Sequence, residues 1–218
     1  MNTTAGPARD LQETTIHSEE SLPRDVMVLT RLNDLRSFMK SDYDLAVCNM
    51  DYPDDYDERI GNWLAKRQEE SGRYKNWSDF QAELSPESSG ILAPFSPILR
   101  FIDGELGLPL RLTMKMVSDQ MCPLLHVDKL QLRFIVTLRG PGTEWFQDKD
   151  VNRKNLGKSG RKPIVLPDSY IQQVGTRQVA VLKGSRFPGS KGLVHRSPSI
   201  NPEKDDPRFF VRIDFGKL

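Results

Sequence analysis

The sequence has little cysteine and histidine, the residues that most often form disulfide bonds or bind metal ions. Its 218 residues include two cysteines and three histidines. Two cysteines are too few for a disulfide framework, so we expect a reducing, cytoplasmic location. One histidine, His17, stands in a polar N-terminal stretch. A metal site built on imidazole must therefore use His126, His195 or both.

The chain also lacks a long hydrophobic run, a secretion signal and an excess of charge. Apolar residues make up 37%, charged residues 28%, and the formal net charge is +1. No window approaches the roughly 18 apolar residues of a transmembrane helix, and the polar N-terminus lacks the apolar core of a signal peptide. We therefore expect a globular protein with no membrane attachment and no strong nucleic-acid binding.

The pattern of apolar residues divides the chain into three segments. Residues 1–22 are rich in Thr, Glu and Ser, which predicts a disordered tail. Residues 23–107 carry apolar side chains at helical spacing, which predicts a helical segment packing on the rest. Residues 108–218 change to a period of two, which predicts a β-core. The expected strands lie at 110–116, 132–138, 163–166, 178–183, 192–195 and 208–215. Helices followed by strands indicate an α+β, mainly β protein, with an N-terminal helical layer on a β-sandwich or barrel.

The stretch CPLLHVD, residues 122–128, contains the first candidate site. Because residues two apart on a strand face the same side, His126 and Asp128 are expected to project together. Such a pair alone is more often a structural or surface feature. His195, which ends the later stretch GLVH, supplies a candidate third ligand. Two histidines and a carboxylate form the facial triad of non-haem Fe(II) oxygenases, so the sequence favours a metal site.

The last predicted strand, RFFVRIDF at 208–215, carries two arginines on one face. Either Arg208 or Arg212 alone would more commonly face solvent. Two arginines together, shortly after the second histidine, can instead clamp a dicarboxylate through the planar fork of the guanidinium group. The residues alone do not choose between Arg208 and Arg212.

These motifs, in this order, resemble a known family. His-x-Asp, RFIVTL, a turn before Trp, VAVLKG, HRSP and the arginine strand are similar to the double-stranded β-helix of 2-oxoglutarate/Fe(II)-dependent oxygenases. CPLLHVD, RGPGTEWF and LKGSRFPGSKGLVHRSP look like the motifs of a bacterial family, the domain of unknown function 1826, over residues 95–215. The resemblance implies a jelly-roll, cupin-like barrel.

The resemblance also implies roles for the candidate residues. His126, Asp128 and His195 would hold Fe(II), and Arg208 or Arg212 would bind 2-oxoglutarate, with Arg208 nearer the usual place of an oxygenase arginine. The implied activity is hydroxylation of a substrate, a small molecule or a protein, that the sequence does not identify. The oligomeric state is equally open.

Cys122 leaves two other functions open. A free cysteine is commonly a small buried hydrophobic residue. Alternatively, Cys122 completes a tetrahedral zinc site with His126, Asp128 and His195, which would close the coordination sphere. The family resemblance then implies a non-catalytic zinc-binding protein acting in zinc homeostasis. In a third hypothesis the barrel is a binding module that holds no metal.

The stretch GPGTEW, residues 140–145, is most simply a turn, since Gly-Pro-Gly forms turns readily. It could also place Glu144 and Trp145 at the rim of the site. Trp145 would then wall a substrate pocket, and Glu144 would support a residue of the site from behind.

Overall fold

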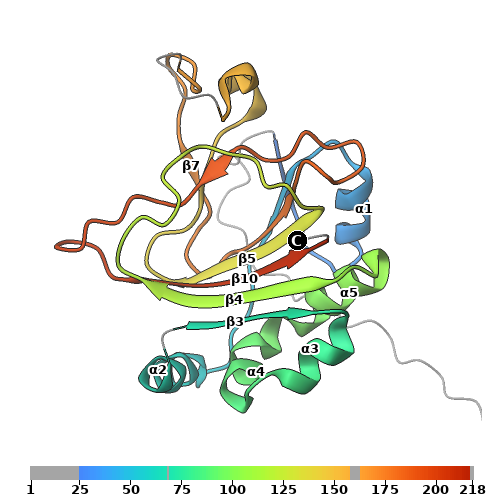
Figure 1. The fold of residues 1–218 in the computed structure, drawn as a ribbon, viewed down its shortest axis with the longest axis vertical. Coiled ribbons are helices and arrows are strands. Elements are labelled where there is room, and N and C mark those ends of the chain that lie inside the picture. Colours follow the sequence, from blue (N-terminus) through green and yellow to red (C-terminus); the bar gives the residue numbers. More distant parts are fainter. Residues whose placement is uncertain (1–24, 68, 158–162, 217–218) are drawn as a thin grey trace, which may run out of the picture.

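The computed structural model describes residues 25–67, 69–157 and 163–216, so the tail predicted at 1–22 lies outside the described residues. Its main feature is a seven-stranded sheet (Figure 1). In spatial order the strands are β1 (Val26–Val28), β2 (Leu45–Cys48), β8 (Val179–Lys183), β5 (Leu132–Arg139), β10 (Arg208–Phe215), β4 (Leu110–Val117) and β3 (Glu69–Tyr74). β1 and β2 pair in parallel, and the other neighbours pair antiparallel.

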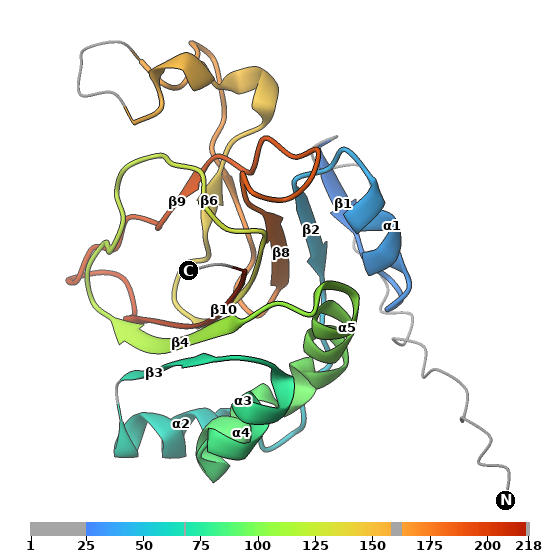
Figure 2. The same cartoon turned by 45° about the vertical axis from the view of Figure 1, so that its right-hand side comes forward.

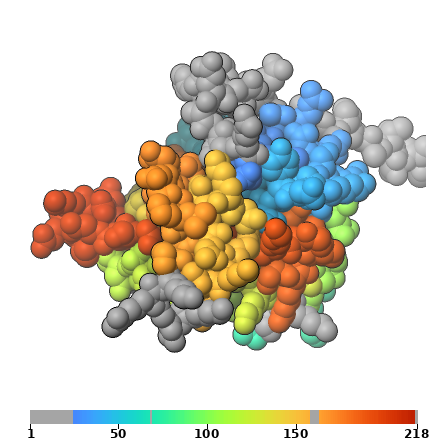
Figure 3. Space-filling model, turned by 90° about the horizontal axis from the view of Figure 1, so that it is seen from above, coloured from blue at the N-terminus to red at the C-terminus, as the bar shows by residue number. Residues whose placement is uncertain are grey.

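A second, small sheet lies on the opposite side from most of the helices (Figure 2). It consists of β7 (Gln172–Gln173), β6 (Glu144–Trp145) and β9 (His195–Arg196), in that order. Two 3-10 helices, η3 (Asp148–Asp150) and η4 (Arg153–Asn155), follow β6. Seen from above, this part of the chain spreads over the upper face, beside the N-terminal elements (Figure 3).

Helices cover the other face of the large sheet. They are α1 (Asp34–Lys40), α2 (Tyr56–Lys66), α3 (Trp77–Glu83), α4 (Pro86–Leu92), the 3-10 helix η2 (Ala93–Phe95) and α5 (Ser96–Leu106). Local signals set their ends: the side chain of Asn76 accepts a hydrogen bond from the backbone of Asp79, and Gly107 ends α5 in a left-handed conformation. Across the described ranges, none of the helices has the length and apolar character needed to cross a membrane.

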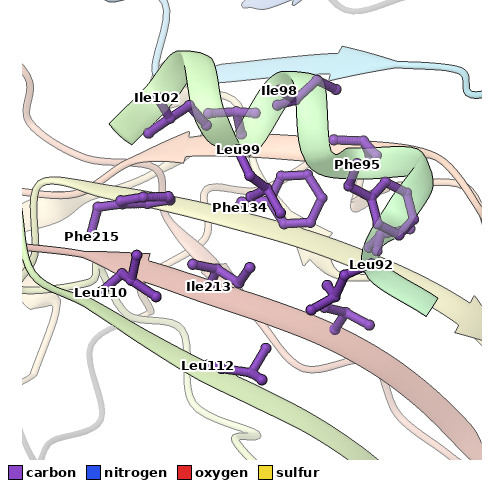
Figure 4. Packing of buried hydrophobic residues seen from close by; sticks show 14 of the residues in the cluster. Leu92, Phe95, Ile98, Leu99, Ile102, Leu110, Leu112, Phe134, Ile213 and Phe215 are labelled. Atoms are coloured by element: carbon purple, nitrogen blue, oxygen red, sulfur yellow. The ribbon is translucent and has the colours of Figure 1, made fainter. Parts of the chain in front are cut away.

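The period-two pattern of β10 explains the two faces of the sheet. Its residues at odd positions, such as Phe209 and Ile213, are buried in the core under the helices. Figure 4 shows side chains of α4, η2 and α5 facing those of β4, β5 and β10, and the rings of Phe95 and Phe134 lie 5.4 Å apart. The alternate residues, including Arg208 and Arg212, project toward the small sheet. One face therefore builds the main core, and the other combines a second apolar cluster, which includes Ile135 and Phe210, with buried polar residues.

The structure confirms a mainly β protein with a large antiparallel sheet, and it adds elements that the pattern did not predict. Three short strands, β1, β2 and β3, lie within the segment expected to be helical. At 163–166 there is no strand, and Val165 forms only an isolated bridge with Val151. β1 and β2 were missed because apolar runs of three or four residues, half-buried in β1 and buried in β2, carry no distinguishable period.

The GPG turn is a close approach between the two sheets. A Cβ atom at Gly142 would lie 1.8 Å from the carbonyl oxygen of Val174, which is closer than any side chain permits. The backbone amide of Val174 in turn donates to the carbonyl of Thr143. Gly142 therefore lets the chain after β5 reach the small sheet.

We expect Gly142→Ala to lower the free energy of unfolding by about 1–3 kcal/mol, because the added methyl group must push two backbones apart. Gly104→Ala is the matched control: Gly104 is an exposed helical residue with open space around its Cα, and the change should raise stability by about 0.5–1 kcal/mol. Urea unfolding of both variants measures the difference. Equal stability of Gly142→Ala and wild type would contradict the close approach.

Candidate metal centre

Two backbone hydrogen bonds bring the two candidate histidines together. The amide of His126 donates to the carbonyl of His195 at 3.0 Å, and the amide of His195 returns a bond of 3.0 Å to His126. Their rings lie side by side, with centroids 4.5 Å apart. His195 belongs to β9, whereas His126 forms an isolated bridge within a loop. The expectation that His126 and Asp128 lie on a strand is therefore wrong, although the two side chains do meet.

Asp128 completes a group of three potential ligands. Its Oδ1 lies 3.7 Å from Nε2 of His126, and its Oδ2 lies 3.3 Å from Nε2 of His195. One ligand atom from each residue can be chosen so that all three lie within 4.8 Å of one another. Metal–ligand bonds of 2.0–2.2 Å place adjacent ligand atoms about 3 Å apart, so small side-chain movements suffice to close the three around one ion.

The backbone sets the tautomer of both histidines. Nδ1 of His126 lies 2.9 Å from the carbonyl oxygen of Leu124, and Nδ1 of His195 lies 3.1 Å from that of Leu193. Because a carbonyl only accepts hydrogen bonds, Nδ1 carries the proton of each neutral ring and Nε2 keeps its lone pair. Nε2 of each histidine and the carboxylate of Asp128 then converge with their lone pairs. Such lone pairs repel one another unless a proton or a cation lies between them. This donor set fits a divalent metal ion.

The protonation states also suit a metal. Burial lowers the pKa of His195 to about 4, against the attraction of Asp128, so this imidazole is neutral at neutral pH. Contact with Asp128 raises the pKa of His126. Burial by itself would raise the pKa of Asp128, but the two histidines and Arg133 outweigh it and hold that pKa well below its usual range. The site therefore presents a permanent carboxylate and a neutral imidazole.

Arg133 of β5 is a member of the site that the sequence analysis missed. Its Nη1 lies 2.6 Å from Oδ2 of Asp128 and 3.5 Å from Nε2 of His195. The contact is electrostatic, since among the described residues no donor reaches this buried Oδ2 with hydrogen-bond geometry. Oδ2 thus keeps a lone pair for a metal. The one signal in the sequence was a charged residue inside the apolar run LRFIV, which must find a partner if it is buried.

That partner is Asp214 of β10, whose side chain is fully buried. Nε of Arg133 donates to Oδ1 of Asp214 at 2.6 Å. Arg111 of β4 donates to Oδ2 at 3.0 Å, and Nε of Arg212 lies 3.5 Å from the same oxygen. One carboxylate in the middle of the sheet therefore holds three guanidinium groups, and Arg133 connects it to the metal ligands.

Arg208, at the start of β10, has a different environment. Its guanidinium donates to the hydroxyl oxygens of Thr137 and Thr143 at 3.1–3.2 Å and lies 4.9 Å from the centre of the Phe210 ring. No carboxylate of the described residues forms an ion pair with it. Burial lowers the pKa of Arg208 to about 10, which shows the cost of keeping this charge without a counter-ion.

A cavity of about 300 Å³ joins these groups. The charged and metal-binding residues that line it are His126, Asp128, Arg133, His195, Arg196, Arg208 and Arg212. The candidate ligands and both candidate anion-binding arginines therefore line one cavity.

The remaining candidates lie around this space. Sγ of Cys122 lines the cavity but lies 3.8 Å from Nδ1 of His126, the nitrogen that faces away from Asp128. The group of possible ligands does not include it. Glu144 forms an ion pair of 2.7 Å with Arg196 and reaches the cavity only through that residue. Trp145 lines a second cavity, of about 390 Å³, beside α1. The roles predicted for Glu144 and Trp145 stay predictions.

Comparisons with known proteins bear on the family and the fold of the chain. A family model described as "Protein of unknown function (DUF1826)" matches residues 103–214. No curated protein matches the sequence. Among solved structures, a prolyl-4-hydroxylase from Pseudomonas putida is similar at 11% identity and a TM-score of 0.51, covering 86% of this chain and 95% of that one.

HygX from Streptomyces hygroscopicus, solved with nickel and 2-oxoglutarate bound, is similar at 11% identity and a TM-score of 0.51, covering 85% and 86% of the two chains. The iron-bound form of HygX gives 12% identity and a TM-score of 0.50, covering 88% of each chain. At such identities the likeness concerns the fold alone. It confirms the resemblance to the oxygenase fold.

The central position of Arg133 gives a prediction about stability. Arg133→Gln should lower the free energy of unfolding by about 3–5 kcal/mol, because it leaves the buried carboxylate of Asp214 without its closest partner. Arg111→Gln removes a partner that is one-third exposed and should cost about 1 kcal/mol or less. Urea unfolding in the presence of a chelator measures both. Equal losses in the two variants would show that Arg133 is not the main partner of Asp214.

Proposed function

The chain belongs to the family of proteins of unknown function DUF1826, and we propose that it is a metal-dependent hydroxylase of the non-haem Fe(II)/2-oxoglutarate type. One observation carries the proposal: His126, Asp128 and His195 converge in a cavity that also contains Arg208, a buried arginine with no acidic partner among the described residues. In this proposal residues 108–218 form most of a double-stranded β-helix, jelly-roll core, and residues 23–107 add the helical layer against it together with the strands β1, β2 and β3. Fold similarity to HygX with nickel and 2-oxoglutarate bound supports it.

In the proposed centre, His126 and His195 each bind the metal through Nε2, and Asp128 binds it through one carboxylate oxygen. When bound, Fe(II) held by three protein ligands supplies open positions for a cosubstrate and dioxygen. The carbonyls of Leu124 and Leu193 fix the orientation of the two imidazoles. Arg133 keeps Asp128 ionised and holds its carboxylate in place.

Arg208 is the better of the two arginines for the cosubstrate. It is buried, it has hydroxyl partners and no acid partner among the described residues, and it lines the same cavity as the metal ligands. A carboxylate placed against it would gain a charge-assisted hydrogen bond in a low-dielectric environment. The hydroxyls of Thr137 and Thr143 orient the guanidinium before the cosubstrate arrives.

The metal ligands are tested by binding. We expect His195→Ala and Asp128→Asn to lose stoichiometric Fe(II), because each removes one of only three protein ligands, while Cys122→Ser keeps it. Anaerobic equilibrium dialysis followed by elemental analysis gives the metal content, and circular dichroism checks the fold. Full metal content in His195→Ala would contradict the site. Tight zinc binding that disappears in Cys122→Ser would instead favour a zinc-binding protein.

The cosubstrate arginine is tested by calorimetric titration of 2-oxoglutarate into anaerobic, Fe(II)-loaded protein. Arg208→Gln should weaken binding at least a hundredfold, since it removes a buried charge of the kind worth about 3 kcal/mol to a charged partner. Arg208→Lys should recover part of the affinity because it keeps the charge without the fork. Arg100→Gln, an exposed residue of α5 on the helical side of the sheet, is the control. Unchanged affinity in Arg208→Gln would reject this role.

A further inference from the structure

The polar face of the sheet carries more positive than negative charge. Arg196 is neutralised by Glu144. Three further guanidinium groups, those of Arg111, Arg133 and Arg212, share the two carboxylates of Asp128 and Asp214. The guanidinium group of Arg208 contacts only hydroxyl groups. Two positive charges therefore have no counterpart among the described residues of the network.

This excess persists in the loaded site of the proposed function. A divalent metal adds two positive charges, and the 2-oxoglutarate dianion removes two. The excess charge of the protein itself is then still uncompensated. Guanidinium groups enclosed at low dielectric attract anions strongly, so a further anionic group would be stabilised in this cavity.

Among the described arginines that line the cavity, Arg212 is the one whose Nε has no hydrogen-bond partner. It lines the cavity, and about a quarter of its side chain is exposed. Its Nη2 donates to Thr113 Oγ1 at 3.1 Å, but its buried Nε has no hydrogen-bond partner among the described residues. The nearest acid, Asp214, already accepts shorter bonds from Arg133 and Arg111. This Nε is enclosed beside Asp214, so an oxyanion in the cavity would contact the exposed part of the Arg212 side chain instead.

The two arginines of β10 are directed to different places. Arg208 donates to Thr137 of β5, whereas Arg212 donates to Thr113 of β4. β4 and β5 flank β10 on opposite sides, so the two side chains lean apart. A cosubstrate carboxylate bound to Arg208 therefore leaves Arg212 free to bind a second anion.

We propose that Arg212, held in place by Thr113, binds a phosphate or carboxylate group of the substrate, so that the protein acts on an anionic molecule. The proposal rests on the function proposed above, in which Arg208 and the metal take the cosubstrate. The exposed part of the Arg212 guanidinium donates to the anion, and the Thr113 hydroxyl holds the guanidinium on the β4 side. The anionic group anchors the substrate at one end of the cavity, while the part to be hydroxylated extends toward the metal ligands.

The experiment uses the full chain loaded with Ni(II) and saturated with 2-oxoglutarate, which leaves the Arg212 position as the remaining anion site. Inorganic phosphate and acetate are titrated separately by calorimetry at constant ionic strength, so the two arms distinguish a phosphate from a carboxylate preference. We expect saturable binding of at least one of them by wild-type protein, weakened at least tenfold in Arg212→Gln. Arg212→Lys should keep part of the affinity, and Arg100→Gln should match wild type.

Thr113→Val, which removes only the hydroxyl, serves as a second variant if Arg212→Gln does not fold, and it should weaken anion binding severalfold. The inference is overturned if loaded wild-type protein binds neither anion or if the Arg212 variants bind them unchanged. It is also overturned if Arg212→Gln loses 2-oxoglutarate itself, since Arg212 would then be the cosubstrate arginine and the proposed function would stand. Failure of wild-type protein to bind 2-oxoglutarate would instead reject the proposed function, and with it the assignment of this anion to a substrate.

Discussion

The buried carboxylate of Asp214 is the constraint on which the candidate site depends. It is fully enclosed in the middle of the large sheet, where an unpaired charge would cost several kcal/mol. Arg133 satisfies it from β5 and at the same time contacts Asp128. The sheet and the candidate metal ligands therefore form one electrostatic unit. The ion pair between Asp214 of β10 and Arg133 fixes the guanidinium of Arg133, and that guanidinium in turn helps to position Asp128.

Backbone contacts supply the rest of the positioning. Asp128 lies in a loop, yet its carbonyl accepts from the amide of Ser185, and the neighbouring amides of Gly184 and Arg186 donate to Gln131 and Leu130. His126 is held by its two-way bridge with His195. Loop residues fixed in this way by a rigid sheet are a common arrangement in functional sites, because the loops can vary while the scaffold keeps the geometry. The ligands thus come from loops and a short strand, while the long strands provide the arginines.

The sequence predicted those parts of the molecule that depend on a long periodic pattern or on a scarce residue. β4, β5 and β10 alternate over eight residues, and His126 and His195 stood out because so few histidines were available. The loop position of His126 was not predictable, since its conformation depends on a bridge to a residue distant in the chain. The role of Arg133 depends on Asp214, 81 positions away, and no local pattern reports such a pair. Likewise, the ring nitrogen of His126 that Sγ of Cys122 approaches is set by the contact of that ring with the Leu124 carbonyl, which no local pattern reports.

The alternation along β10 links stability and chemistry within one strand. Its apolar residues hold the helices, so the strand cannot shift by one position without turning the arginines into the core. Its position between β4 and β5 gives the polar residues two different neighbours, which is why Arg208 and Arg212 diverge although they share a face. The cavity therefore has two separate positive ends on either side of the strand. The described arginines of this face outnumber the carboxylates that they contact, and the proposed metal and cosubstrate leave that excess of positive charge uncompensated. This excess is the physical reason to assign Arg212 to an anionic substrate group.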